Sequence, residues 1–389
     1  MKVLHVIWSI DPRNGGPPVA LVGMAKAQAQ LGLEVSIITT WKRGENLAAI
    51  EQLKDYQVQV EPVGPCSGPL VRHPKLSDTI KKMVSAADIV HIHGLWEEIN
   101  HQAAQSAQRL GRPYLVRPCG MLDPWSLGQS RLKKQLYMRW RLNQNLDHAR
   151  AIHYTSRSEA DRSLPLQIKA PVIIEPNGLD LEEFAQLPPP GTFRAKYPGL
   201  GQRPMLLFMS RLHRKKGLDL LIPAFAKANS GDAILTVAGP DEDGYRAEVE
   251  ALVTRYNISG KVLFCGALHG PDRVAALADA DLFVLPSYQE NFGIVVVEAL
   301  AANTPVIISD QVNICNQIKD SKVGAVVSLN IDALSNEITH WINDGELRQV
   351  AASGARAMVW AQYDWQQIAQ RWIKHYTLLV APVATSTSL

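Results

Sequence analysis

Short apolar runs alternate with amphipathic segments along nearly the whole chain. The runs cover residues 3–8, 35–39, 89–93, 114–117, 151–154 and 172–175 in the first half, and residues 205–209, 233–238, 262–264, 282–285, 306–308 and 325–327 in the second. An unbroken apolar run of this length is typical of a parallel strand that is covered on both faces. Strands that alternate with helical patterns predict parallel sheets with right-handed crossovers.

Helical periodicity and its interruptions indicate where the domains end. Residues 18–30 and 97–110 have the pattern of crossover helices, each followed by a closing glycine, Gly32 and Gly111. The stretch 178–203 contains the run LPPPG and breaks the alternation, so we interpret it as the interdomain connection.

We therefore expect an α/β protein with two Rossmann-like, doubly wound domains. The first is placed at 1–190 and the second at 191–362, with a last helical segment at 363–389. A chain of 389 residues has room for two or three domains of about 150 residues each.

Composition and charge narrow the classes of function. Hydrophobic residues make up 46% of the chain and charged residues 20%, as in an ordinary soluble protein. Lys plus Arg number 40 and Asp plus Glu 37, so no strong global charge favours nucleic-acid binding. No apolar run approaches the roughly 18 residues of a membrane span, and the first apolar segment is too short for a signal peptide. The cysteines are far apart without a C-x-x-C pair, which fits a reducing cytoplasm.

Two glutamates eight positions apart, Glu290 and Glu298, lie where an apolar strand is followed directly by a helix. The first falls in the loop at the carboxyl end of the strand and the second inside the helix, on the rim where open α/β sheets bind ligands. The N–H groups that begin this helix favour an anion such as phosphate, and Gly293 permits close approach. A carboxylate here accepts hydrogen bonds from sugar hydroxyls. The alternative is that both glutamates only complement the helix dipole.

Two cations follow the apolar run at 205–209. Arg211 comes just after the strand and Lys216 just before a helix that is entered at Gly217. This spacing suits a diphosphate, because two positive groups neutralise the charge that develops on a leaving nucleotide. Taken alone, the run HRKK is more typical of a solvated basic turn.

Together the two stretches resemble the R-L-x-x-x-K-G element and the E-x7-E signature of the family 4 retaining glycosyltransferases, which have the GT-B fold. Asn303 stands where the family usually has glycine, and asparagine tolerates left-handed backbone angles. The resemblance implies two Rossmann-like domains that face each other across a cleft, with the last helix returning to the first domain. It also implies that Glu290 contacts hydroxyls of the transferred sugar and that Glu298 holds the ribose of the nucleotide.

The first half contributes a glycine pair and a histidine. NGGPPVALVGMA follows the first strand and resembles the family's glycine-rich loop, which implies that Gly15 and Gly16 approach the donor; a tight turn before a helix is the alternative. His91 and His93 alternate in a strand, so both rings are expected on one face. The resemblance implies that His93, nearer the strand end, hydrogen-bonds the donor sugar near the reacting carbon. The pair is a poor metal site, because no further ligands lie at suitable spacing.

Two D-x-D pairs raise the alternative of a metal-dependent transferase. Asp241 and Asp243 are expected to cap the helix near Tyr245, and Asp279 and Asp281 precede the strand that leads to the glutamates. Because two cations are already available to neutralise a diphosphate, we expect no metal and no other cofactor.

The resemblance implies retaining transfer of a glycosyl group from a UDP- or GDP-linked sugar to an acceptor hydroxyl, in the biosynthesis of a polysaccharide, lipopolysaccharide or glycolipid. An NDP-sugar epimerase, a phosphorylase and a noncatalytic sugar-binding module are the alternatives. The expected catalytic residues are His93, Arg211, Lys216 and Glu290. The expected donor-binding residues are Gly15, Gly16, Arg211, Lys216, Leu268, Glu290, Asn291, Phe292, Gly293, Ile294 and Glu298.

Residues 131–146 predict a helix with an apolar stripe beside basic side chains. The apolar stripe holds Leu132, Leu136 and Trp140, and the basic residues are Arg131, Lys133, Lys134, Arg139 and Arg141. Such a helix can lie on an anionic membrane surface, which would bring a cytoplasmic enzyme to the inner face of the membrane and to a lipid-linked acceptor. The alternative is an ordinary surface helix packed on its domain.

Overall fold

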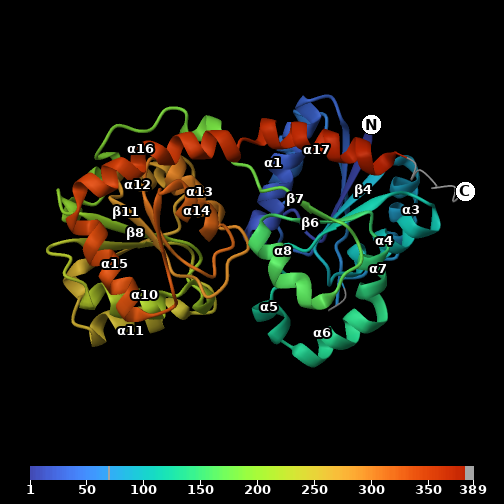
Figure 1. The fold of residues 1–389 in the computed structure, drawn as a ribbon. Helices are drawn as coiled ribbons and strands as arrows, with labels where there is room; N and C mark the ends of the chain where they lie inside the picture. Colours follow the sequence, from blue (N-terminus) through green and yellow to red (C-terminus); the bar gives the residue numbers. More distant parts are fainter. Residues whose placement is uncertain (69–70, 382–389) are drawn as a thin grey trace, which may run out of the picture. The chain divides into compact units, whose positions relative to one another are not determined.

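The computed structural model describes residues 1–68 and 71–381, and this part of the chain forms two compact units (Figure 1). The first unit comprises Met1–Gly178 together with the segment that begins at Trp365, and the second comprises Leu179–Asp364. The second unit thus begins before the expected boundary at 190, because Leu179 and Phe184 are buried in its hydrophobic core.

In the described residues, the first unit contains a seven-stranded parallel sheet with the order β3-β2-β1-β4-β5-β6-β7. Its strands are β1 (Lys2–Ile7), β2 (Glu34–Thr40), β3 (Gln59–Val63), β4 (Ile89–His93), β5 (Tyr114–Arg117), β6 (Ala151–Tyr154) and β7 (Val172–Ile174). The strand order reverses between β1 and β4, which is where open α/β sheets bind ligands. The sequence pattern missed β3, because this edge strand contains Pro62 and is largely exposed, and so has no apolar run.

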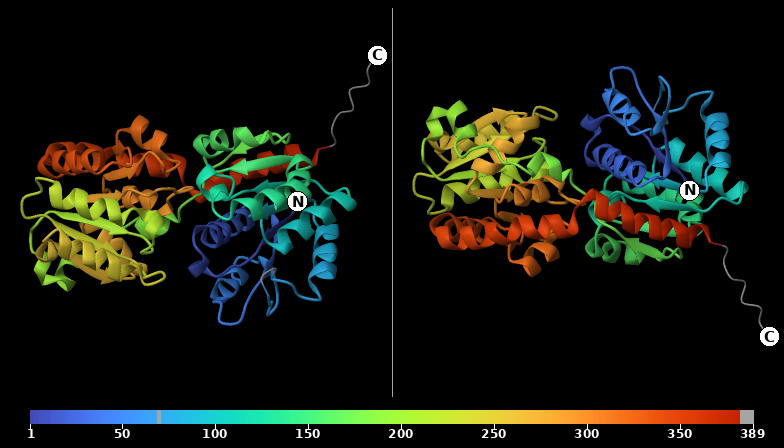
Figure 2. Two further views of the ribbon diagram at one scale, coloured as in Figure 1. Left: turned by 90° about the horizontal axis from the view of Figure 1, so that it is seen from below. Right: turned by 90° about the horizontal axis from the view of Figure 1, so that it is seen from above.

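Helices cover both faces of the first sheet (Figure 2). The helices of this unit are α1 (Gly16–Gln30), α2 (Ala48–Lys54), α3 (Leu76–Ala86), α4 (Glu98–Arg109), α5 (Pro124–Gly128), α6 (Arg131–Tyr137), α7 (Asn143–Asp147), α8 (Arg157–Ser163) and α17 (Trp365–Val380), of which α5 and α6 bury no residue. Val3 of β1 belongs to a core with α1 and α17, whereas Leu4 belongs to a core with α3 and α4. This alternation follows from the period of two along a strand.

The expected single helix at 131–146 is interrupted. A π-helical turn, η2 (Met138–Leu142), separates α6 from α7. Such turns insert an extra residue into the helix and shift the stripes that side chains form on its surface.

The second unit, Leu179–Asp364, contains a six-stranded parallel sheet with the order β10-β9-β8-β11-β12-β13. The strands are β8 (Met205–Met209), β9 (Ile234–Ala238), β10 (Val262–Gly266), β11 (Leu282–Leu285), β12 (Val306–Ser309) and β13 (Gly324–Val327). Its helices are α9 (Thr192–Lys196), α10 (Leu218–Lys227), α11 (Tyr245–Arg255), α12 (Gly270–Asp279), α13 (Ile294–Ala301), α14 (Cys315–Ser321), α15 (Ile331–Asn343) and α16 (Gly345–Gln362).

Both sheets are thus doubly wound, as the alternating pattern predicts, and the order again reverses in the second sheet, between β8 and β11. Short 3₁₀ turns complete the connections: η1 (Pro12–Asn14), η3 (Leu164–Leu166), η4 (Leu181–Phe184), η5 (Pro198–Leu200), η6 (Arg214–Lys216) and η7 (Ser259–Lys261). Within the described ranges, no helix is long and apolar enough to cross a membrane. The cysteines Cys66, Cys119, Cys265 and Cys315 are all free thiols.

Candidate functional site

The turn after β8 is docked on the loop after β11. Gly217 has φ +75°, and a Cβ at this position would lie 2.0 Å from the carbonyl oxygen of Pro286, so only glycine fits the approach. The Tyr288 N–H also donates to the Lys215 carbonyl at 2.8 Å. Because β8 and β11 are neighbours in the sheet, these contacts bring two motifs distant in sequence to one rim.

The docked turn places Lys216 against Glu290. The Lys216 ammonium is paired with Oε2 of Glu290, and the two side chains are only 11% and 18% exposed. Burial by itself would raise the pKa of Glu290, but the charges of Lys216, Lys215 and Arg211 outweigh it and hold the pKa below its ordinary value. Glu290 is therefore a carboxylate at neutral pH, surrounded by cations.

Arg211, the other expected cation, is half exposed on the same rim. Its Nη1 lies 2.8 Å from both carboxylate oxygens of Glu242, a partner that the motif did not indicate. The structure therefore gathers Arg211, Lys216 and Glu290 in one electrostatic cluster, as expected from the two motifs.

The start of α13 carries the remaining residues of this motif. Gly293 is its N-cap in the left-handed region, at φ +73°, and no side chain caps the first turn. A Cβ on Gly293 would lie 3.3 Å from Cγ of Glu290, so the helix start is adjacent to that carboxylate. Phe292 is buried and meets the ring of Tyr363 edge to face, so it can offer a ligand only its backbone.

Glu298 lies farther along α13 and has a cationic partner of its own. Its Oε1 is paired with Nη1 of Arg273, whose Nη2 is paired with Glu183. Burial, with a further contribution from the neighbouring Glu183, raises the pKa of Glu298 to about 7 against the opposing effect of Arg273. Sequence reasoning missed Arg273, because nothing in α12 marks one charged residue as a partner for the next helix.

The loop after β10 and residues of the two D-x-D pairs make contacts within the second unit. Leu268 is half buried and packs on the core of the second unit. Oδ1 of Asp241 accepts the N–H of Arg246 at 3.0 Å, at the start of α11, as expected for a cap. Asp279 accepts the N–H groups of Gly191, Phe193 and Arg194, and Asp281 pairs with Arg194.

In the first unit, the glycine pair begins α1. Gly15 is its N-cap with φ +101°, and a Cβ on Gly16 would meet no atom within 4 Å. The backbone here is thus accessible to a ligand, which is compatible with the expected approach of the donor.

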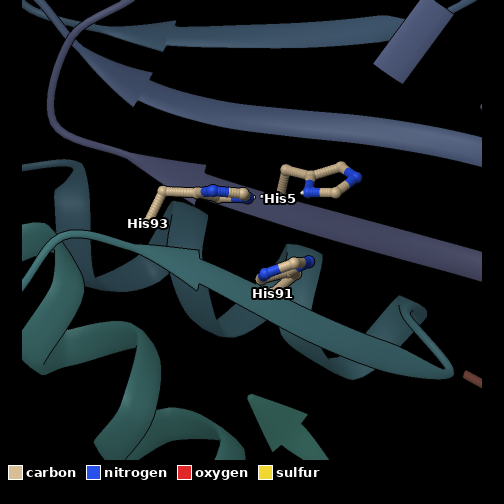
Figure 3. A group of neighbouring side chains, drawn as sticks. All are labelled: His5, His91 and His93. Atoms are coloured by element: carbon tan, nitrogen blue, oxygen red, sulfur yellow. Dashed lines mark hydrogen bonds between the residues drawn. The ribbon is translucent and has the colours of Figure 1, made fainter. Parts of the chain in front are cut away.

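His93 is fully buried and is part of a group of three histidines (Figure 3). His91 and His93 project from one face of β4, as the alternation predicts, and His5 on β1 is the register partner of His91. Nδ1 of His5 lies 3.0 Å from Nε2 of His93, and Nε2 of His5 lies 2.8 Å from Oε1 of Gln28.

A second chain of contacts includes the other histidine of β4. Nδ1 of His91 lies 2.8 Å from the hydroxyl of Tyr376 in α17, and its Nε2 lies 3.1 Å from Nδ1 of His153 in β6. Nε2 of His153 lies 2.9 Å from the carbonyl oxygen of Glu175. The histidines of three strands thus form a continuous buried polar row under α17.

The expectation that no further ligand lies near His91 and His93 is wrong, because β1 supplies His5. The ligand atoms of His5, His91 and His93 lie within 4.8 Å of one another. Their nitrogens nevertheless already have partners, apart from Nδ1 of His93. Burial lowers the pKa of His5 to about 4 and the pKa of the other two well below the ordinary value, and the nearby Arg117 guanidinium acts in the same direction. Such a positive neighbour disfavours a cation.

Arg117 is a site residue that sequence reasoning missed. It ends β5 as the register partner of His93 and is 1% exposed. Its Nη2 donates to Oδ1 of Asn177, whereas Nε and Nη1 have no hydrogen-bond partner among the described residues. A buried guanidinium with free donors, next to the free Nδ1 of His93, marks this strand end as a place for a polar ligand. The only signal in the sequence was a charged residue at the end of an apolar run.

The helix at 131–146 exposes its apolar stripe. Leu132, Leu136 and Trp140 are 82%, 56% and 74% exposed. Two of the five basic residues are engaged within the unit: Lys134 donates to the Ser126 carbonyl and lies over a tryptophan ring, and Arg141 pairs with Glu98 at 3.0 Å. Those two are therefore less available to a membrane than the sequence indicated.

Comparisons with known proteins cover both units. The family model described as Glycosyl transferase 4-like domain matches residues 15–178, and the one described as Glycosyl transferases group 1 matches residues 192–358. An uncharacterised glycosyltransferase of Methanocaldococcus jannaschii is 27% identical, over 97% of this chain and 98% of that protein. The GDP-mannose:cellobiosyl-diphosphopolyprenol alpha-mannosyltransferase of Xanthomonas campestris is 26% identical, over 97% of this chain and 96% of that protein.

The fold also matches a solved structure over nearly its whole length. The crystal structure of Anabaena HepE in complex with UDP aligns with a TM-score of 0.80 at 20% identity, and covers 97% of this chain and 100% of that one. Because both units match glycosyltransferase models and the two-sheet fold is that of the GT-B enzymes, the chain belongs to the family 4-like glycosyltransferases.

Proposed function

We propose that this glycosyltransferase moves a sugar from a nucleoside diphosphate donor to an acceptor hydroxyl with retention of anomeric configuration and without a metal ion. The observation that carries the proposal is the buried pair of Lys216 and Glu290 at the carboxyl ends of β8 and β11. It holds a cation suited to a leaving diphosphate next to an anion suited to sugar hydroxyls. The match to the Xanthomonas mannosyltransferase supports a nucleotide-sugar donor.

Each of the four charged residues of the two motifs has a role in this reaction. Lys216, Arg211 and the uncapped start of α13 stabilise the diphosphate as its bond to the anomeric carbon breaks. Glu290, kept ionised by its cationic neighbours, accepts hydrogen bonds from the sugar. Glu298 holds the ribose. The acceptor oxygen forms its bond on the face that the diphosphate leaves, and its proton passes to the departing phosphate oxygen.

His93 and the glycine pair complete the proposal on the first unit. A neutral imidazole can hydrogen-bond a sugar hydroxyl, and the lowered pKa keeps His93 neutral. Gly15 and Gly16 offer backbone N–H groups, and the base is expected at Leu268. The donor is linked to UDP or GDP: the Anabaena structure contains UDP, and the Xanthomonas relative is named for GDP-mannose.

A donor panel tests this function. We expect one UDP- or GDP-sugar to raise the melting temperature of the full chain, and the same donor to support transfer that retains the anomeric configuration and persists in EDTA. Loss of transfer in EDTA with recovery in magnesium would show that Arg211 and Lys216 do not suffice to stabilise the leaving diphosphate. Turnover of the donor without an acceptor would favour an epimerase, and donor binding without any turnover would favour a sugar-binding module.

The exposed stripe of α6 and η2 supports a second proposal, that the protein docks on an anionic membrane surface from the cytoplasmic side. Three apolar side chains stand free beside Arg131, Lys133 and Arg139, which are all exposed. Apolar insertion and basic attraction are the two forces that hold a helix at such a surface. A lipid-linked acceptor, such as the one in the name of the Xanthomonas relative, would be presented there.

A further inference from the structure

A cavity in the first unit lies beside the proposed donor loop and contains none of the expected site residues. It has a volume of about 340 Å³ and lies at the carboxyl ends of β1, β2 and β4. Its lining residues are Trp8, Asn14, Trp41, Lys42, Glu45, Val71, Trp96 and Glu97. This volume is at the lower end of the range of small-molecule sites, about 300–1,000 Å³.

Three indole rings make up the apolar part of the lining, and each is held by its own contacts. A Cβ on Gly94 would lie 2.7 Å from the ring of Trp8, and a Cβ on Gly64 would lie 2.7 Å from Nε1 of Trp41, so each glycine lets the backbone lie against an indole. Trp96 meets the ring of Tyr137 edge to face at 5.7 Å. Rings fixed in this way lose little conformational entropy when a ligand binds.

The polar part of the lining has hydrogen-bonding groups of both kinds. Lys42 is exposed, and its ammonium has no ion-pair partner within the described ranges. Glu45 accepts the Ser9 hydroxyl at 3.1 Å, and Glu97 accepts the Asn100 amide at 3.3 Å, which leaves further lone pairs on both carboxylates. Burial raises the pKa of the Glu97 carboxyl.

This combination matches the chemistry of a pyranose ring. A pyranose has an apolar face of C–H groups, which stacks on the negative face of an indole, and a rim of hydroxyls, which bond carboxylates and ammonium groups. A phosphate fits poorly, because two carboxylates oppose it and one lysine favours it. A lipid chain fits poorly as well, because it would cover the half-buried Glu97 carboxyl without offering it a hydrogen bond.

We propose that this cavity, the tryptophan pocket, binds a neutral glycosyl residue of the acceptor. The inference rests on the proposed transferase function and deepens it, since it identifies the acceptor end as a sugar rather than a phosphorylated headgroup. Asn14 lines the pocket and directly precedes Gly15 and Gly16, so an acceptor sugar bound here lies next to the loop assigned to the donor.

Calorimetric titration of the full chain with neutral disaccharides (cellobiose, maltose and mannobiose), each beside its 6-phosphate, tests the pocket directly. We expect at least one neutral disaccharide to bind about tenfold more tightly than its phosphate. Trp41→Ala and Glu97→Gln should each weaken that binding about tenfold, and Trp41→Phe should restore most of it. Trp125→Ala, a change to an exposed tryptophan of α5 outside the pocket, should have no effect. Melting temperatures identify any variant that fails to fold. If Trp41→Ala does not fold, Glu97→Gln still tests the pocket, because this change leaves the shape of the side chain nearly unchanged.

The transfer reaction separates failure of the pocket from failure of the function. In the transfer assay, the pocket variants should raise the acceptor KM and leave the donor affinity unchanged. Three outcomes would overturn the pocket and leave the transferase function standing. They are an acceptor KM that Trp41→Ala and Glu97→Gln do not change, weakened donor binding in these two variants, and the absence of disaccharide binding by the unmodified protein. Disaccharide binding that depends on Trp41, in a protein that transfers no sugar from any donor, would uphold the pocket and overturn the transferase.

Discussion

At the scale of single residues, the proposed site depends on charges that are buried together. Lys216 and Glu290 are each other's main partner, and both are largely removed from solvent. Removing one member of such a pair leaves the other charge without compensation, so the ammonium and the carboxylate support each other before any donor arrives. The expected roles of both residues agree with this coupling, because a diphosphate and a sugar ring are adjacent in a nucleotide sugar.

Lys216→Ala should therefore lower kcat by about 10²–10³-fold, as loss of one preorganised charge-stabilising donor does in other enzymes. Steady-state transfer with the donor found in the panel measures the effect. Lys227→Ala provides the control, because that lysine lies in the adjacent α10 but makes an exposed pair with Asp332. If the two alanine variants transfer sugar equally fast, Lys216 does not stabilise the leaving group.

At the scale of elements, strand register produces the histidine row. His5 and His91 are register partners on β1 and β4, and His153 extends the row onto β6. Polar groups packed against it include Arg117 from β5, Gln28 from α1, Tyr376 and His375 from α17, and the Glu175 carbonyl. Burial keeps these histidines neutral, so the folded state binds fewer protons than the unfolded chain below the ordinary histidine pKa.

The stability contributed by this row should be fully present above about pH 6.5 and lost as the pH falls toward the folded pKa of His5, about 4. Each such histidine lowers the free energy of unfolding by roughly 1.4 kcal/mol for every pH unit that the pH falls within that window. Urea unfolding at pH 7.5 and 5.5 should give a smaller difference for His5→Gln than for the unmodified protein. His148→Gln, at an exposed histidine, should leave the difference unchanged. Equal differences for all three proteins would show that His5 is protonated equally in both states.

The stripe on α6 and η2 makes a prediction at the same scale. Replacing Arg131, Lys133 and Arg139 with alanine should weaken binding to phosphatidylglycerol vesicles by about 1 kcal/mol per residue, because each basic side chain near an anionic surface contributes about that much. Cosedimentation measures the loss. Replacing Lys75, Lys81 and Lys82 at α3 removes the same charge from another part of the unit and should have little effect. Equal binding by the two triple variants would exclude docking through α6.

At the scale of the whole molecule, the chain is divided into two compact units that hold different candidate sites. The second unit holds most of the residues expected to bind the donor, and the first holds Gly15, Gly16, His93 and the tryptophan pocket. In each sheet the strand order reverses once, and the candidate residues lie near that reversal except for Leu268, which follows the edge strand β10. Most strands were predicted within one residue of their observed ends, because buried parallel strands appear in sequence as short apolar runs. The edge strand β3 and the break in the helix at 131–146 were not predicted, because neither leaves such a run.

The sequence by itself determined the α/β class, the succession of strands and helices, and the two motifs with Arg211, Lys216, Glu290 and Glu298. Each of these depends on residues that are close together along the chain. The tertiary structure alone decided which of these residues touch. Lys216 meets Glu290 across 74 positions, and the three tryptophans of the pocket come from three strand ends. Such neighbours are set by strand order and register, which depend on packing of the whole sheet rather than on any local pattern.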